Sequence, residues 1–238
     1  MLINYFQIPT NFTATCLVSS IFIFIGAQNT EFGDIKAHSI SIINNDGKET
    51  LWLGNGENGG GFLETFNRKG NRTSSLGSSH NQNGSLSLFN VEGKAISYFS
   101  DYLVTFNSNE KQTTYLGNTK NGGGYLATFN SAGTESVSLG VDDQENSGHL
   151  KTFNKNGTKT SFLGSNTKGI GHLFTYGAEG NKTNFLGSSS EGKGYLATYN
   201  SNSITGYFGT GPNSEGIIGL HDANKNLGWS ASGKTNNN

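Results

Sequence analysis

The sequence contains little cysteine, little charge and little proline, and the first two shortages exclude classes of protein. Its only cysteine, Cys16, allows neither a disulfide within one chain nor a cysteine-based metal site. Sixteen basic and 17 acidic residues give a formal net charge of −1, so the basic surface expected of a nucleic-acid-binding protein is absent. Two prolines among abundant Gly, Ser, Thr, Asn and aromatic residues are typical of many short strands and tight turns, and we expect no long helices.

The N-terminal residues 1–30 contain no charged side chain, and residues 16–27, CLVSSIFIFIGA, form their apolar core. A membrane span needs about 20 residues, which this core reaches only with its uncharged flanks. A cleaved signal peptide would carry a basic segment before the core, and this sequence has none. We expect a membrane anchor with the rest of the chain extracytoplasmic. The alternatives are a cleaved signal of a secreted protein and a packed segment of a soluble one.

A repeat occupies residues 37–209, after a linker at 31–36, and its eight units share the consensus G-[F/Y/H]-L-x-T-F-N-x-x-G-x-x-T-x-[F/Y]-L-G. The residue after the central aromatic recurs every 23 or 24 residues, with one gap of 17. These positions are Asn44, Asn67, Asn90, Asn107, Asn130, Asn154, Gly177 and Asn200. Residues 210–228 resemble a degenerate terminal unit, as capping repeats often are, and residues 229–238 form a polar tail.

Each unit predicts two strands joined by a turn at N-x-x-G. An Asn side chain accepts hydrogen bonds from the backbone ahead of it, and Gly tolerates the positive φ that closes such a turn. The expected glycines are Gly47, Gly70, Gly93, Gly133, Gly157 and Gly180. Glu110 and Ser203 stand in this position in the two remaining units. The chain should therefore reverse direction at each of these turns.

The 17-residue gap indicates how neighbouring strands are connected. A polar loop of about six residues joins most units, but only Ser100 and Asp101 separate Phe99 from Tyr102. Two residues can join antiparallel strands, whereas parallel strands need a crossover of a dozen or more. The sequence therefore predicts an elongated all-β antiparallel meander of ~23-residue hairpins. A β-solenoid and an intertwined trimeric β-shaft are the alternatives.

Both faces of the predicted sheet carry apolar side chains. Tyr125, Ala127 and Phe129 alternate with Leu126 and Thr128, and successive strand residues point to opposite faces. A half-exposed sheet should be apolar on one face only. We therefore expect the second apolar column to pack against the curled sheet itself or against another copy of the chain, so self-association is predicted.

No arrangement of residues indicates catalysis, a cofactor or a metal. His149 and His172 occupy equivalent positions one hairpin apart, which corresponds to roughly 10 Å and is too far to share a zinc ion. The acidic residues 142–145 lie in one loop, which supplies too few oxygens for calcium. We expect a protein that is not an enzyme and that binds no cofactor, metal or nucleic acid.

The first aromatic position of each unit is the candidate ligand site. A packing role is the simplest interpretation of these rings, and the alternative is a platform on which sugar rings stack, because exposed aromatic side chains concentrate binding energy. The candidate stacking residues are Phe62, Tyr125, His149, His172 and Tyr195.

An apolar N-terminus, the segment IKAHSISIINNDGKETLWLG (35–54) and reiterated G-x-L-x-x-F-N-x-x-G units resemble uncharacterised bacterial exported or membrane-anchored repeat proteins. They are also similar to the shaft repeats of phage tail fibres. The resemblance implies a surface location and brings no catalytic residues. We expect a non-enzymatic surface protein that serves as a stalk, spacer or assembly subunit, with membrane contact through residues 1–30. A carbohydrate-binding module using the aromatic column is the alternative, with a glycan as its partner.

Overall fold

The computed structural model describes residues 34–56, 59–79, 81–142, 146–201 and 203–233. The repeat region forms a compact unit that begins at Ser39. The predicted anchor at 1–30 lies outside the described residues. Within the described part of the chain, no helix is long and apolar enough to cross a membrane.

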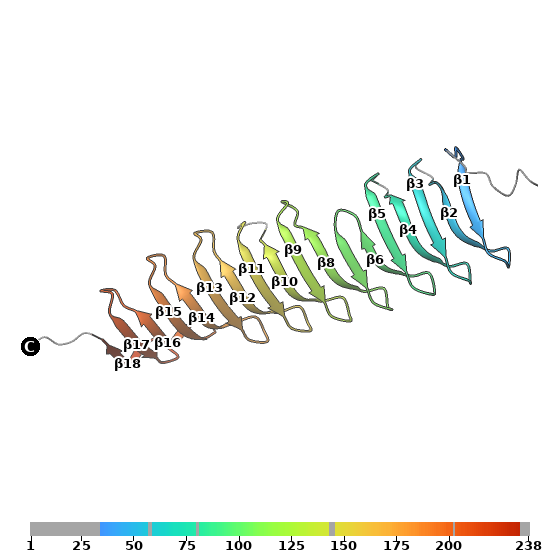
Figure 1. Cartoon of the computed structure of the whole chain (residues 1–238). Helices are drawn as coiled ribbons and strands as arrows, with labels where there is room; N and C mark the ends of the chain where they lie inside the picture. Colours follow the sequence, from blue (N-terminus) through green and yellow to red (C-terminus); the bar gives the residue numbers. More distant parts are fainter. Residues whose placement is uncertain (1–33, 57–58, 80, 143–145, 202, 234–238) are drawn as a thin grey trace, which may run out of the picture. The chain divides into compact units, whose positions relative to one another are not determined.

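Eighteen strands form a single antiparallel sheet (Figure 1). Their bounds are β1 (Ser39–Ile43), β2 (Glu49–Asn55), β3 (Gly61–Phe66), β4 (Arg72–Ser78), β5 (Gly84–Phe89), β6 (Ala95–Phe99), β7 (Leu103–Phe106), β8 (Gln112–Asn118), β9 (Gly124–Phe129), β10 (Glu135–Val141), β11 (Gly148–Phe153), β12 (Lys159–Ser165), β13 (Gly171–Tyr176), β14 (Lys182–Ser188), β15 (Gly194–Asn200), β16 (Ser203–Thr210), β17 (Gly216–His221) and β18 (Leu227–Ser232). The last strand thus includes residues 229–232 of the predicted polar tail.

The strands follow one another in chain order across the sheet. Each pairs antiparallel with the strand before it and the strand after it, so β1 and β18 are the two edges. The sheet stays open and does not close into a barrel. This confirms the predicted meander, and the solenoid alternative does not apply because no parallel pair occurs among the described strands.

The N-x-x-G turns have the predicted hydrogen bonds. Asn154 Oδ1 accepts hydrogen bonds from the backbone N–H groups of Asn156 at 2.9 Å and Thr158 at 3.0 Å, and Gly157 has a φ of +82°. The Asn154 side chain also donates through Nδ2 to the carbonyl oxygen of Ala178 at 3.3 Å. Ala178 lies in the turn of the next hairpin. The asparagine therefore closes its own turn and links it to the neighbouring hairpin.

The two turns that lack the glycine differ from each other. Glu110 adopts the expected left-handed conformation, with a φ of 59°. Ser203 does not, because β15 extends to Asn200, which pairs directly with Ser203, and Ser201 carries the positive φ of 57°. A shorter turn has replaced the N-x-x-G geometry here.

The short connection between β6 and β7 is one residue longer than predicted. Phe99 pairs with Leu103, and the Ser100 N–H donates to the Tyr102 carbonyl oxygen at 3.0 Å, so Ser100, Asp101 and Tyr102 form the connection. A connection of three residues is still too short to join parallel strands, so the predicted antiparallel topology holds.

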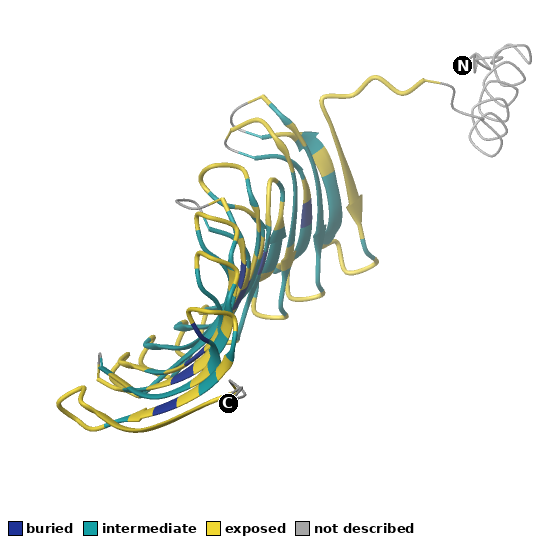
Figure 2. Cartoon of the chain, turned by 90° about the vertical axis from the view of Figure 1, so that its left-hand side faces the viewer, coloured by how far each residue is buried: buried dark blue, intermediate teal, exposed yellow. Residues whose placement is uncertain are grey.

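The buried side chains lie on one face of the sheet, which we call the aromatic face because it carries Tyr125, Ala127 and Phe129. Its buried residues are Ser75, Val104, Ala127, Ser138, His149, Phe185 and Ala197. Figure 2 shows them as short stretches within the strands. The opposite face, which carries Leu126 and Thr128, is called the leucine face. The repeat unit therefore has a one-sided core.

Candidate functional site

The five predicted stacking residues share one cross-strand row on the aromatic face, where rings alternate with glycines. Tyr125 lies opposite Gly117 on one neighbouring strand and Gly140 on the other. His149 lies between Gly140 and Gly164, and the same alternation holds at Phe62, His172 and Tyr195. The glycine of the L-G pair in each repeat is thus placed beside the ring of the neighbouring strand.

The neighbouring strand leaves no space for a side chain at most of these glycines. A Cβ at Gly140 would lie 2.5 Å from the Gly124 carbonyl oxygen and 2.9 Å from Tyr125 Cα. At Gly209 it would lie 2.4 Å from Tyr195 Cβ. Because real Cβ atoms do not approach other atoms so closely, glycine is what allows each ring to lie over the adjacent strand.

The structure adds a second set of rings that sequence reasoning did not assign to the site. Consecutive ring centroids lie 4.5–6.5 Å apart in an unbroken series from β6 to β16. The series is Tyr98, Tyr102, Tyr115, Tyr125, His149, Phe162, His172, Phe185, Tyr195 and Tyr207. The second aromatic of the consensus was the available signal, but only the strand register shows that it inserts between first-position rings.

Most neighbouring rings of this series stack face to face, and the pairs Tyr98–Tyr102, Tyr115–Tyr125 and Tyr125–His149 are tilted. The planes of Phe162 and His172 are inclined by 24°, those of Phe185 and Tyr195 by 29°, and those of Tyr195 and Tyr207 by 18°. Near-parallel rings at this spacing occupy each other's faces. The series thus serves first as packing. Phe62 shares the row but has no ring contact with the series among the described residues.

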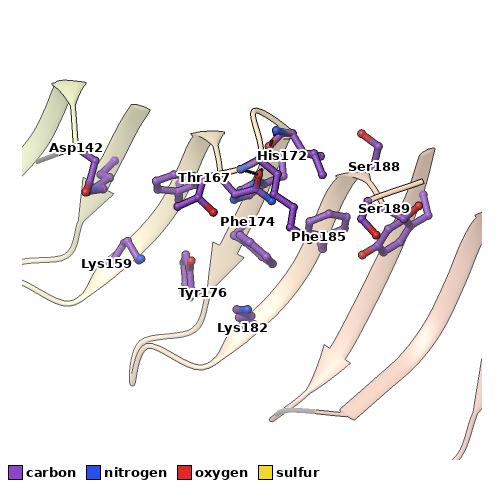
Figure 3. A pocket seen from close by; sticks show the side chains of 17 residues that line it. Asp142, Lys159, Thr167, His172, Phe174, Tyr176, Lys182, Phe185, Ser188 and Ser189 are labelled. Carbon is purple, nitrogen blue, oxygen red and sulfur yellow. Dashed lines mark hydrogen bonds and ion pairs between the residues drawn. The ribbon is translucent and has the colours of Figure 1, made fainter. Parts of the chain in front are cut away.

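A hollow of about 620 Å³ lies over β11–β15 on the aromatic face (Figure 3). Phe174 and Tyr176 line it beside the ring series, and lysine ammonium groups lie over their rings. Lys182 Nζ is 4.3 Å from the Phe174 centroid, and Lys159 Nζ is 4.7 Å from the Tyr176 centroid. Such contacts are cation–π interactions. The hollow therefore offers ammonium groups and ring edges.

Acidic groups contribute at one end of the hollow. Asp142 Oδ2 lies 3.1 Å from Lys151 Nζ, which forms an ion pair. The rest of the predicted acidic loop, residues 143–145, lies outside the described residues. Among those described, no three His, Cys, Asp or Glu side chains lie close enough to hold a metal ion.

Burial shifts the pKa values of several rings on the aromatic face toward their uncharged forms. Burial lowers the pKa of His149, and the nearby charge of Lys151 lowers it further. Burial also raises the pKa values of Tyr125, Tyr176 and Tyr195 above their usual range. Lys151, Lys159, Lys168 and Lys182 place ammonium groups around the hollow.

The second candidate surface is a row of apolar side chains that crosses the leucine face from β1 to β18, which we call the leucine ladder. Its members pair strand to strand as Ile40, Leu53, Leu63, Leu76, Leu86, Phe99, Leu103, Leu116, Leu126, Leu139, Leu150, Leu163, Leu173, Leu186, Leu196, Phe208, Ile218 and Ala231. Leu76, Leu116, Leu139, Leu163 and Leu186 are 52–54% exposed. Sequence reasoning identified the second apolar column but not its continuity.

Comparison with known proteins provides no family assignment. No protein-family model matches the sequence, and no curated protein matches it. A mutant Tc holotoxin pore of Photorhabdus luminescens is similar over 88% of this chain and 14% of its own, with 10% identity and a TM-score of 0.23. A crystal structure of TcdB2-TccC3 without the hypervariable C-terminal region is similar over 83% of this chain and 16% of its own, with 8% identity and a TM-score of 0.17. At these scores the similarity carries no argument about function.

Proposed function

We propose that this protein is a non-enzymatic structural or interaction protein of the cell surface, whose repeat sheet serves as a stalk, spacer or assembly subunit. The observation that carries the proposal is the constancy of the repeat. One hairpin recurs in the same register across the sheet, and its rings, glycines and leucines form continuous rows. Repeats that contact only their neighbours add length without altering the rest of the array.

The location follows from the apolar residues 1–30, which would hold the repeat region at a membrane with the hairpins on the extracytoplasmic side. In the secreted alternative, the same sheet would act after release. Protease treatment of intact cells should cleave an epitope tag placed at the C-terminus if the repeats lie outside, while a cytoplasmic control protein stays intact.

Removal of one repeat tests the spacer role. Deleting residues 108–130 joins Asn107 to Ser131, the residue that follows the equivalent Asn130, so the register is kept. The full chain without this hairpin should retain its far-ultraviolet circular dichroism per residue and shorten by about 10 Å, two strand spacings, in small-angle scattering. A control lacking only residues 119–130 removes one strand and should lose ordered β-structure. Unfolding of the first variant would contradict a modular spacer.

A carbohydrate-binding module is the second candidate, and the hollow on the aromatic face favours it. Because the stacked rings cover one another and the lysines cover Phe174 and Tyr176, this site would engage a sugar through ring edges and ammonium groups, which suits acidic glycans. An array of acidic and neutral glycans tests this. Binding should fall in Lys159→Gln/Lys182→Gln and persist in Lys94→Gln, whose lysine pairs with Glu110 in the turns. The absence of binding to any glycan would remove the candidate.

A further inference from the structure

The leucine ladder leaves an apolar row uncovered along the whole sheet. A β-sheet normally buries each apolar face against another layer, and soluble monomers rarely expose contiguous apolar patches of more than a few hundred Å². Ring side chains pack together on the aromatic face from β6 to β16. On the leucine face the described residues supply no second layer, and about half of the surface of Leu116, Leu139 and Leu163 is exposed. The ladder therefore requires a covering partner.

The charges of the sheet are confined to the other face. By register, each Asp, Glu, Lys, Arg or His of the described strands belongs to the aromatic face, and none belongs to the leucine face. These residues are Glu49, Glu64, Arg72, Glu135, His149, Lys151, Lys159, His172, Lys182 and His221. Eighteen strands without a charge on one face correspond to a surface that is buried, because buried charges are costly and solvated faces usually carry them.

Many hydroxyl groups of the leucine face are hydrogen-bonded to one another. A row of threonine hydroxyls runs beside the ladder, and in three hairpins the bulge brings a third hydroxyl to a hydrogen-bonded pair. Thr65 Oγ1 lies 2.7 Å from Thr73 Oγ1 and 2.6 Å from Ser74 Oγ. Thr152 Oγ1 lies 2.7 Å from the hydroxyls of both Thr160 and Ser161. Groups that are hydrogen-bonded within the chain can be covered without the penalty of an unpaired polar group.

We propose that the leucine face packs against the leucine face of a second copy of this chain. The proposal rests on the assembly role given above and names its interface. The ladder and its hydroxyl row are roughly 80 Å long and 14 Å wide at ordinary strand and residue spacings, on the order of 1,000 Å² per copy. A stable interface needs about 800 Å² per partner. The available area is therefore sufficient for a dimer.

The period and charge of the face favour a second copy over another partner. A ligand that covers the ladder must repeat with the strand spacing of about 4.8 Å over the same length, and the same ladder does so. Two copies of an uncharged face can also pack together without repulsion between like charges. Two copies of the aromatic face would bring their charged side chains together. Two-fold symmetry makes such a contact isologous. With full overlap, Leu139 of β10 lies opposite the same residue of the second copy or one strand away from it.

Sedimentation velocity of the full chain tests the pairing. The wild-type protein should sediment as a dimer of the 25.3 kDa chain. The double variant Leu139→Lys/Leu163→Lys places two charges on the ladder at half-exposed positions, so the monomer should stay folded by circular dichroism while the dissociation constant rises at least 100-fold. Val91→Lys, at a 54% exposed position in a turn, is the matched control and should remain dimeric.

Cross-linking locates the contact independently. In a Cys16→Ser background, Leu139→Cys should form a covalent dimer with a bismaleimide that spans about 10 Å, the usual separation of packed sheets. The same treatment of Val91→Cys should give monomer. Cross-linking at position 91 and not at 139 would overturn the proposal.

The remaining outcomes separate the interface from the function. If the double variant associates as strongly as the wild type, the assembly role survives through residues 1–30 or the edge strands, but the leucine face is not its interface. If the wild type is a monomer that binds phosphatidylcholine vesicles and the double variant is not bound, the occupant is a lipid surface and the proposal fails. A monomer that binds no vesicles removes both this interface and the assembly role.

Discussion

Replacing Gly140 by Ala tests whether the alternation of rings and glycines determines the fold. The added Cβ would lie 2.5 Å from the Gly124 carbonyl oxygen, 2.9 Å from Tyr125 Cα and 3.0 Å from Tyr125 Cδ2. Two of these three atoms belong to the backbone of β9, so rotating the tyrosine ring cannot relieve the contact. The β9–β10 pair must separate locally.

The expected cost is that of overpacking a fitted site, about 1–3 kcal/mol. The matched control is Gly124→Ala on the neighbouring strand, where an added Cβ meets nothing within 4 Å. A surface change of this kind should stay within about 0.5 kcal/mol of the parent protein. Both variants make the same chemical change, so their difference isolates the contact of position 140 with Gly124 and Tyr125 of β9.

Amide hydrogen exchange is the suitable assay, because repeat arrays can open locally and exchange reports the stability of each strand separately. Gly140→Ala should lower the protection of amides in β9, β10 and β11 about 5- to 150-fold, the equivalent of 1–3 kcal/mol. Strands β2–β4 should keep the protection of the parent protein. Equal protection in the Gly140 and Gly124 variants would refute the argument that β9 leaves no space for a side chain at position 140.

Two other predictions address the turns and the buried histidine. Asn154→Ala removes two hydrogen bonds within its turn and one to Ala178, and should cost about 1–3 kcal/mol by urea denaturation. Asn166→Ala is its control, because among the described residues Asn166 Oδ1 accepts only the two hydrogen bonds within its own turn. An equal loss of stability in both variants would argue against the link between turns. His149 has a pKa lowered by burial and by Lys151, so the unfolded chain binds its proton more tightly and stability should fall as pH drops below the ordinary value of 6.5. His149→Phe should flatten that part of the Tm profile between pH 8 and 5, and an unchanged slope would show that the histidine does not cause it.

Much of the fold could be predicted from local chemistry. The N-x-x-G turns form as expected because Asn and Gly favour them within a few residues of chain, whatever lies beyond. The antiparallel order followed from the short connection after Phe99, and it held although Tyr102 proved to belong to that connection. The turn at Ser203 was predicted wrongly, because the extension of β15 to Asn200 depends on pairing with β16.

The candidate site could be predicted only in part. The first-position rings were identified by their repetition, but the insertion of Phe162 between His149 and His172 depends on register between strands. The same is true of Lys159 and Lys182, whose ammonium groups reach the rings of the neighbouring hairpin or strand. Sequence periodicity gives the side-chain direction along one strand and does not state which residue lies beside it on the next.

The sequence by itself determined the repeating hairpin, its turns and the two apolar columns, because strand alternation and turn propensity act over a few residues. Only the tertiary structure decided that the rings interleave over glycines, that the leucines form one ladder, and that the strand charges share a single face. Those features depend on the pairing of residues on different strands, for example Leu126 with Leu139 and then Leu139 with Leu150. Register across strands is a property of the assembled sheet, and it turns a local pattern into two chemically different surfaces.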